Sequence, residues 1–202
     1  MNTQRKPLIV GIGGASRENS ITERALSFAL DIARSLGATT QLFTHDQLDV
    51  PMYAPENADR TPEASALVKA FREFDGLILA SPSYHGTFSG MVKNVLDYTE
   101  DLRADAEPYL HGRPVALIAT AHGWQDVGYT LVSLRSVVHA LRGWPTPLGV
   151  GISTLAEPFD DQGRCLDDKL AGQLRALAEQ VVKFAGNRDL LVERIEAESR
   201  AA

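Results

Sequence analysis

The sequence predicts an α/β protein with a doubly wound, five-stranded parallel sheet and helices on both faces. Three observations predict it. Short apolar runs alternate with longer segments of helical periodicity. The runs are apolar on both faces, as in strands that helices cover on both sides. Each predicted strand is followed by a predicted helix, and glycine or proline residues separate many of these segments. This alternation is typical of parallel sheets.

Each predicted element rests on its apolar spacing. The predicted strands cover residues 8–13, 40–44, 76–80, 114–119 and 146–153. The run at 40–44 is short and alternating, which indicates a strand near the sheet edge. Apolar residues repeat at spacings of three and four in the predicted helices, at residues 25–36, 63–74, 91–98, 131–141 and 167–186. Residues 50–62 contain three prolines and no periodicity, which predicts a surface loop of functional length.

The chain length predicts a single main domain. We expect this domain to cover residues 1–187 and a short C-terminal tail to cover residues 188–202. The tail carries an apolar cluster among charged residues, formed by Leu190, Leu191, Val192 and Ile195. This pattern predicts a helix that packs on the body of the protein or on a partner subunit.

Composition excludes several classes of protein. The 202 residues include 20 Lys and Arg against 26 Asp and Glu, a net charge of −6, and no basic tract that would favour nucleic acid. No run approaches the roughly 20 apolar residues of a membrane helix. The single cysteine, Cys165, excludes an internal disulfide and suits a reducing compartment. We therefore expect a cytoplasmic protein that binds neither nucleic acid nor membrane.

The loop after the first predicted strand has the composition of an anion site. Glycines allow a tight turn, Ser16 and Ser20 supply hydroxyl groups, and Arg17 supplies a permanent positive charge. The free amides of the next helix complete a site suited to phosphate. In the alternative interpretation, Asn19 or Ser20 only caps that helix, with Glu23 closing a capping box, and the two roles are compatible.

The same loop does not fit the usual dinucleotide or triphosphate patterns. Ser16 stands where the dinucleotide fingerprint requires its third glycine, and no acidic residue lies at the expected distance beyond it. No Gly-Lys-Ser/Thr triplet follows the glycines either. The loop therefore predicts a monophosphate ligand.

The loop after the third predicted strand, residues 81–90, suits a planar heterocycle. Pro82 and Gly86 fix a backbone path that exposes main-chain hydrogen-bonding groups, while Tyr84 and His85 offer flat surfaces. For His85, contact with a ligand ring and ordinary loop packing both remain open. Phe88 alone is more typical of a core residue.

The loop after the fourth predicted strand carries Thr120, Ala121, His122, Gly123 and Trp124. It combines small residues, an aromatic residue and the N-terminus of the following helix, whose partial positive charge favours electron-rich groups. No second His, Cys or carboxylate stands at ligand spacing from His122, so we predict no metal site.

Two motifs resemble the NAD(P)H-dependent FMN reductases. The first resembles their phosphate loop and reads Gly14-x-Ser16-Arg17-x-x-Ser20. The second resembles a more specific block and reads Pro82-x-Tyr84-His85-Gly86-Thr87-x-Ser89-Gly90-x-x-Lys93-Asn94-x-x-Asp97. The similarity covers about residues 8–151. The chain departs from the family pattern at Ala15 and Glu18, and residues 121–124 lack the usual double glycine.

The resemblance implies a flavodoxin-like fold that binds FMN. The implied phosphate ligands are Ser16, Arg17 and Ser20. The residues predicted to bind the cofactor are Ser16, Arg17, Asn19, Ser20, Pro82, Ser83, Tyr84, His85, Gly86, Thr87, Thr120, Ala121, His122, Gly123 and Trp124. The resemblance further implies a homodimer or homotetramer. Lys93, Asn94 and Asp97 are interpreted as a salt-bridged helix surface at a subunit contact.

The predicted function is hydride transfer from NAD(P)H to FMN and on to an acceptor such as free FMN, a quinone or an azo compound. The flavin carries the chemistry, so the prediction requires no catalytic side chain. Two alternatives remain open at this point. One is a flavodoxin-like electron carrier or sensor that binds FMN without oxidising NAD(P)H, and the other is a nucleotide-binding hydrolase without redox chemistry.

Overall fold

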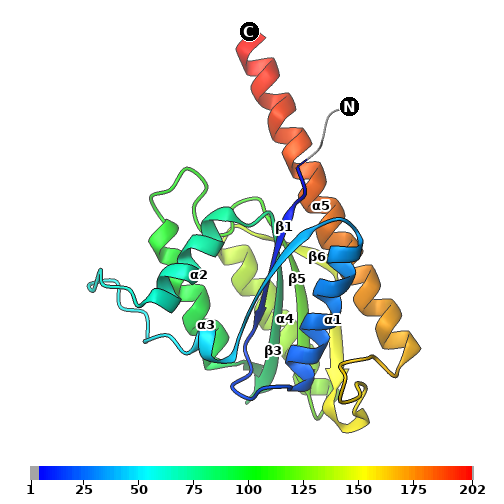
Figure 1. The fold of residues 1–202 in the computed structure, drawn as a ribbon. Coiled ribbons are helices and arrows are strands. Elements are labelled where there is room, and N and C mark those ends of the chain that lie inside the picture. Colours follow the sequence, from blue (N-terminus) through cyan, green and yellow to red (C-terminus); the bar gives the residue numbers. More distant parts are fainter. Residues whose placement is uncertain (1–4, 202) are drawn as a thin grey trace.

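The computed structural model describes the backbone of residues 5–201 and their side chains except those of 189–197 and 199–201. Its centre is a parallel sheet in the order β2-β1-β3-β5-β6 (Figure 1). The parallel strands are β1 (Leu8–Gly13), β2 (Thr39–Thr44), β3 (Gly76–Tyr84), β5 (Pro114–Ala121) and β6 (Trp144–Ser153). This is the order of the flavodoxin-like fold, so the predicted fold class is confirmed.

Helices cover both faces of the sheet, because consecutive strand residues point to opposite sides. Figure 1 shows α1 and α5 on one side and α2, α3 and α4 on the other. The helices are α1 (Ile21–Ser35), α2 (Pro62–Glu73), α3 (Gly90–Asp97), α4 (Trp124–Ala140) and α5 (Asp168–Ala201). The short 3-10 helices are η1 (His45–Leu48), η2 (Tyr98–Leu102) and η3 (Thr154–Ala156).

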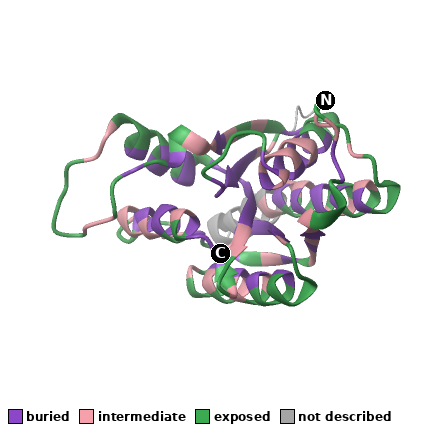
Figure 2. Cartoon of the chain, turned by 90° about the horizontal axis from the view of Figure 1, so that it is seen from below, coloured by how far each residue is buried: buried purple, intermediate pink, exposed green. Residues whose placement is uncertain are grey.

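Two hydrophobic cores follow from this alternation, one on each face of the sheet. In β3, Leu77 and Leu79 pack into the core beneath α2, α3 and α4, whereas Ile78 and Ala80 pack into the core beneath α1 and α5. Figure 2 shows the buried residues concentrated on the sheet and on the helix sides that face it. Burial on both faces is the reason that these strands read as continuous apolar runs.

Several elements begin or end at other residues than the sequence predicts, and tertiary contacts explain three of the differences. The strand predicted to end at residue 80 continues to Tyr84, where it pairs with β4 (Thr87–Phe88) in a hairpin. α4 begins at Trp124 rather than at residue 131, because Val127 and Thr130 extend its buried side toward the N-terminus. β6 begins at Trp144, two residues before its predicted start, because Trp144 pairs with Pro114.

The C-terminal part of the chain is one long helix. α5 runs from Asp168 to Ala201 across the predicted boundary at residue 187, and its residues up to Ala185 pack into the core beneath α1. The predicted packing of the apolar cluster in the tail concerns side chains outside the described residues. Within residues 5–201, no helix has both the length and the apolar composition needed to cross a membrane.

Candidate functional site

A cavity of about 480 Å³ opens at the carboxyl ends of the central strands. Parallel strands all end at the same edge of the sheet, so the segments that follow β1, β3, β5 and β6 meet there. The cavity is lined by Ala15, Ser16, Arg17, Ser20, Ile21, Thr22, Pro82, Tyr84, Thr120, His122, Thr154 and Glu157. It lies at the point where the strand order reverses between β1 and β3, the usual ligand position in such sheets.

One side of the cavity is an anion site at the N-terminus of α1. Ser20 is the N-cap residue, and its Oγ accepts a hydrogen bond of 3.2 Å from the amide of Glu23. The carboxylate of Glu23 in turn accepts from the amide of Asn19 at 2.8 Å. The predicted capping role is therefore present. It leaves the amides of Ile21 and Thr22 without a hydrogen-bond partner among the described residues.

Arg17 supplies the positive charge of this side. Its side chain is exposed and lines the cavity, and it forms no ion pair within residues 5–188. A guanidinium group with free donors beside two serine hydroxyls and two free helix amides is a donor set that matches a phosphate.

Ser89 locks the first loop onto the segment after β3. Its Oγ donates to the carbonyl of Gly14 at 2.8 Å and accepts from the amide of Val92 at 3.2 Å. Its own amide donates to Oγ of Ser81 at 2.9 Å. Gly14 is required at this contact, because a Cβ atom there would lie 2.0 Å from Cγ2 of the buried Val92.

A second lock joins α1 to β5. The hydroxyl groups of Thr22 and Thr120 are 2.7 Å apart, and both residues are buried. Each residue also lines the cavity. The two locks join the ends of β1, β3 and β5 through buried hydrogen bonds.

The hairpin formed by the end of β3 and by β4 lies at the open side of the cavity. Pro82 and Tyr84 line it, and the Tyr84 side chain is exposed. His85 and Gly86 form the turn with φ values of 51° and 83°, which confirms the predicted unusual backbone path. Phe88 is buried in the core, as predicted for this residue.

Several predicted residues do not line this cavity. Of the first loop, Asn19 faces a neighbouring polar hollow. In the hairpin, the residues outside the lining are Ser83, His85, Gly86 and Thr87, and in the third loop they are Ala121, Gly123 and Trp124. Their predicted contact with the cofactor stays a prediction.

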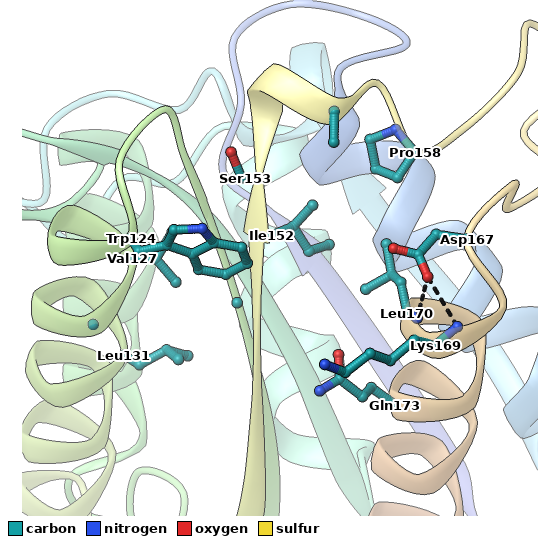
Figure 3. Close-up of a pocket in the computed structure, with 13 residues that line it drawn as sticks. Trp124, Val127, Leu131, Ile152, Ser153, Pro158, Asp167, Lys169, Leu170 and Gln173 are labelled. Carbon is teal, nitrogen blue, oxygen red and sulfur yellow. Dashed lines mark hydrogen bonds between the residues drawn. The ribbon is translucent and has the colours of Figure 1, made fainter.

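Trp124 lies instead in a second cleft, of about 520 Å³, at the open edge of β6. Figure 3 shows its indole ring on the α4 side of β6, with Lys169 and Gln173 of α5 on the other side. Trp124 is the first residue of α4, and it lines this second cleft instead of the cavity.

The segment after β6 contributes two residues to the cavity that no sequence motif predicted. Thr154 and Glu157 line the cavity, and Glu157 has a φ of 41°. The rule that pointed to the other loops applies here too, because these residues also follow the carboxyl end of a strand. The position of the segment after a strand therefore indicated a possible site. The segment has no glycine motif like those of the other loops, so it was not predicted to line the cavity.

The second motif contains a loop anchor as well as an ion pair. Lys93 and Asp97 form the predicted i,i+4 pair at 2.6 Å on the surface of α3. The prediction that Asn94 lies on the same exposed helix surface is wrong, because Asn94 is buried. Its Oδ1 accepts from the amide of Tyr53 at 2.8 Å, and its Nδ2 donates to the carbonyls of Val50 and Pro51 at 3.1 and 3.0 Å.

The far end of the same proline-rich loop is fixed by charge. Arg60 makes two hydrogen bonds, of 2.7 and 2.8 Å, with Asp101 and lies over the rings of Tyr53 and Tyr98. The hydrogen bonds from Arg60 lower the pKa of Asp101. Burial, followed by the hydrogen bond to Asp101, raises the pKa of Tyr53. The loop at residues 50–60 is thus held on α3 and η2.

The chain is similar to proteins named as FMN reductases along most of its length. It is 28% identical over 185 residues to an NAD(P)H-dependent FMN reductase of Pseudomonas aeruginosa, covering 88% of this chain and 97% of the relative. It is 26% identical over 204 residues to the NADPH-dependent FMN reductase ArsH of Acidithiobacillus ferrooxidans, covering 99% and 84%. It is also 26% identical over 183 residues to an FMN-dependent NADPH-azoreductase of Staphylococcus aureus, covering 86% and 93%.

Solved structures share the fold. FerB, a flavoenzyme NAD(P)H:(acceptor) oxidoreductase of Paracoccus denitrificans, superposes with a TM-score of 0.73 at 19% identity and covers 90% of this chain and 98% of its own. At these identities the likeness shows the fold alone. Residues 7–156, which contain the whole sheet and every residue lining the cavity except Glu157, match the NADPH-dependent FMN reductase family. The chain therefore belongs to the NADPH-dependent FMN reductase family of oxidoreductases.

Proposed function

We propose that the chain binds FMN in the 480 Å³ cavity and uses NAD(P)H to reduce a small acceptor such as free FMN, a quinone or an azo compound. The observation that carries the proposal is the joining of an anion site to polar and aromatic side chains in one cavity. Arg17 and Ser20 belong to the first loop and the start of α1, Tyr84 and Thr120 belong to β3 and β5, and His122 directly follows β5.

The donor set of the cavity fits FMN. Its monophosphate would be held by Arg17, by the hydroxyls of Ser16 and Ser20, and by the free amides at the start of α1. The cavity volume of 480 Å³ falls within the range of about 300–1,000 Å³ that is common for small-molecule sites. The ring would meet Pro82 and Tyr84, with donors from Thr120 and His122 beside it.

FMN, when bound, supplies the hydride chemistry, and the side chains of this chain bind and orient it. The two locks through Ser89 and Thr22 hold the cavity walls in place, so binding does not require the loops to be ordered. The exposed Tyr84 leaves one side open, where a nicotinamide and then an acceptor can approach in turn. Such alternation needs only proximity and orientation from the protein.

The acceptor and the assembly belong to the same proposal. A relative named as an azoreductase supports an acceptor with a conjugated double bond.

The outward side of α4 exposes Tyr129 by 53% and Val132 by 63%, which supports a homodimer or homotetramer built on that face. The single cysteine supports the cytoplasm as its compartment. Ultracentrifugation of the protein and of Val132→Lys measures the assembly, and a monomeric parent protein contradicts it.

A ligand titration tests the FMN site. We expect the FMN affinity to fall roughly 10- to 100-fold in Arg17→Ala, because hydrogen bonds to charged groups contribute about 1.5–3 kcal/mol. Affinity for riboflavin, which lacks the phosphate, should be unchanged. Arg34→Ala is the matched control, since Arg34 lies at the opposite end of α1, about 20 Å away. Equal losses for FMN and riboflavin would contradict the phosphate assignment.

A spectrum distinguishes the reductase from the alternatives. The FMN complex should lose its yellow colour when NADH or NADPH is added without oxygen, and regain it with an acceptor. An electron carrier or sensor would hold FMN but stay yellow with either nicotinamide. A hydrolase without redox chemistry would remain colourless after mixing with FMN and gel filtration.

A further inference from the structure

The segment after β6 holds His122 at two points. The Oγ of Ser153 donates to the carbonyl of His122 at 3.1 Å, and the Oγ1 of Thr154 is 2.7 Å from its Nδ1. The register of the sheet explains this contact. Ala121 pairs with Ser153 in parallel, so the chain leaves β5 and β6 side by side, and the next residue of each strand meets the other. Figure 3 shows Ser153 at this end of β6.

The contact with Thr154 leaves one ring nitrogen of His122 available. Among the described residues, Nε2 of His122 has no hydrogen-bond partner, and the Thr154 hydroxyl has none other than Nδ1. A hydroxyl that donates to Nδ1 makes that nitrogen an acceptor and leaves the ring proton on Nε2. Both residues line the cavity, so with the Thr154 hydroxyl as donor an N–H group on Nε2 would be available to a ligand there.

We propose that Thr154 is a positioning residue that fixes the tautomer of His122, so that Nε2–H donates a hydrogen bond to the pyrimidine end of the flavin ring. The inference rests on the proposed function. That end of the ring becomes electron-rich on reduction, and a hydrogen bond to a more negative acceptor is stronger. The pair therefore holds reduced FMN more tightly than oxidised FMN and raises the midpoint potential.

The test measures FMN affinity in both redox states rather than turnover. In Thr154→Val, which keeps the shape and removes the hydroxyl, we expect affinity for reduced FMN to fall about tenfold more than affinity for oxidised FMN. For a two-electron couple this lowers the midpoint potential by about 30 mV. Thr154→Ser should restore the parent potential, because it keeps the hydroxyl group.

Two controls separate this role from general destabilisation. Thr39→Val removes a threonine hydroxyl at the opposite edge of the sheet, where it donates to Pro7, and should leave the potential unchanged. In a His122→Ala background, Thr154→Val should cause no further shift, because Thr154 acts through the imidazole ring. Nitrogen-15 NMR of the parent protein should show the His122 proton on Nε2.

The outcomes are distinct. A parent protein that does not bind FMN overturns the proposed function and this inference with it. A parent protein that binds FMN, with an unchanged potential in Thr154→Val, overturns the inference alone. A proton on Nδ1, or an equal shift with and without His122, also overturns it. A variant that loses both oxidised and reduced FMN equally, and is not rescued by Thr154→Ser, assigns Thr154 a structural role instead.

Discussion

Two glycines, each next to segments that line the cavity, are required for different physical reasons. Gly14 lies in the first loop, where a Cβ atom would be 2.0 Å from a methyl group of Val92. Gly86 lies at the tip of the hairpin with a φ of +83°, and a Cβ atom there would meet nothing within 4 Å. The first glycine permits close packing, and the second permits a backbone conformation.

The difference separates a rigid region from an open one. Around Gly14, buried hydrogen bonds from Ser89 tie two loops together. At the hairpin tip, His85 is exposed and also has a positive φ, and the pairing of Tyr84 with Thr87 closes the turn. We infer that the packed region holds the cofactor and that the exposed tip faces the exchange of nicotinamide and acceptor.

The largest expected effect is that of Gly14→Ala. Val92 is buried on α3 and cannot rotate away, so we expect a loss of roughly 2–3 kcal/mol in the free energy of unfolding, typical of an overpacked core. FMN affinity should fall with it, because the first loop must move. Urea unfolding and an FMN titration measure the two effects. Wild-type stability in this variant would contradict the packing role.

Ser89→Ala should cost about 2 kcal/mol of stability. The substitution removes the cap of α3 and leaves the Gly14 carbonyl without its donor. The measurement is again denaturant unfolding. Ser136→Ala, on the exposed side of α4, is the matched control and should change stability by less than about 0.5 kcal/mol. Equal losses in the two variants would mean that Ser89 does not lock the loops.

Gly86→Ala should cost about 1 kcal/mol, because the left-handed conformation is unfavourable for a residue with a Cβ atom. Gly86→Asn should cost less, since asparagine tolerates this conformation. Thermal unfolding of both variants measures the difference. Equal losses for Ala and Asn would point to packing rather than to backbone conformation.

The smallest effect on stability is expected for His85→Asn. Asparagine keeps the positive φ of the turn, so unfolding should change by less than about 0.5 kcal/mol and FMN affinity should stay constant. Turnover or acceptor preference should change instead, because the exposed His85 directly follows Tyr84, which lines the open side of the cavity. Steady-state rates with a quinone and an azo dye measure this. Loss of FMN with unchanged kinetics would place His85 on the cofactor side.

Sequence patterns predicted the strands and their order of appearance well, because burial on both faces leaves continuous apolar runs. They predicted element ends less well where tertiary contacts extend an element. β3 continues to Tyr84 because β4 folds back on it, and α4 begins seven residues early because Val127 meets the sheet. Asn94 was assigned to a helix surface because its spacing from Lys93 does not reveal the loop that it anchors.

The candidate site divides in the same way. The motif around Ser16 and Arg17 identified an anion site, since glycines, hydroxyls and a guanidinium group before a helix have few other uses. The place of Trp124 outside the cavity, and of Thr154 and Glu157 within it, could not be predicted from motifs. These placements depend on where α4 starts and how β6 ends beside β5.

The sequence by itself determined the alternation of strands and helices and the chemistry of the phosphate loop, because both follow from residues close together in the chain. Only the tertiary structure decided which side chains share one cavity. Register between parallel strands brings His122 to Thr154, and hydrogen bonds between distant loops join Gly14 to Ser89. Such contacts join residues that are far apart in the chain, so a pattern within one short segment cannot predict them.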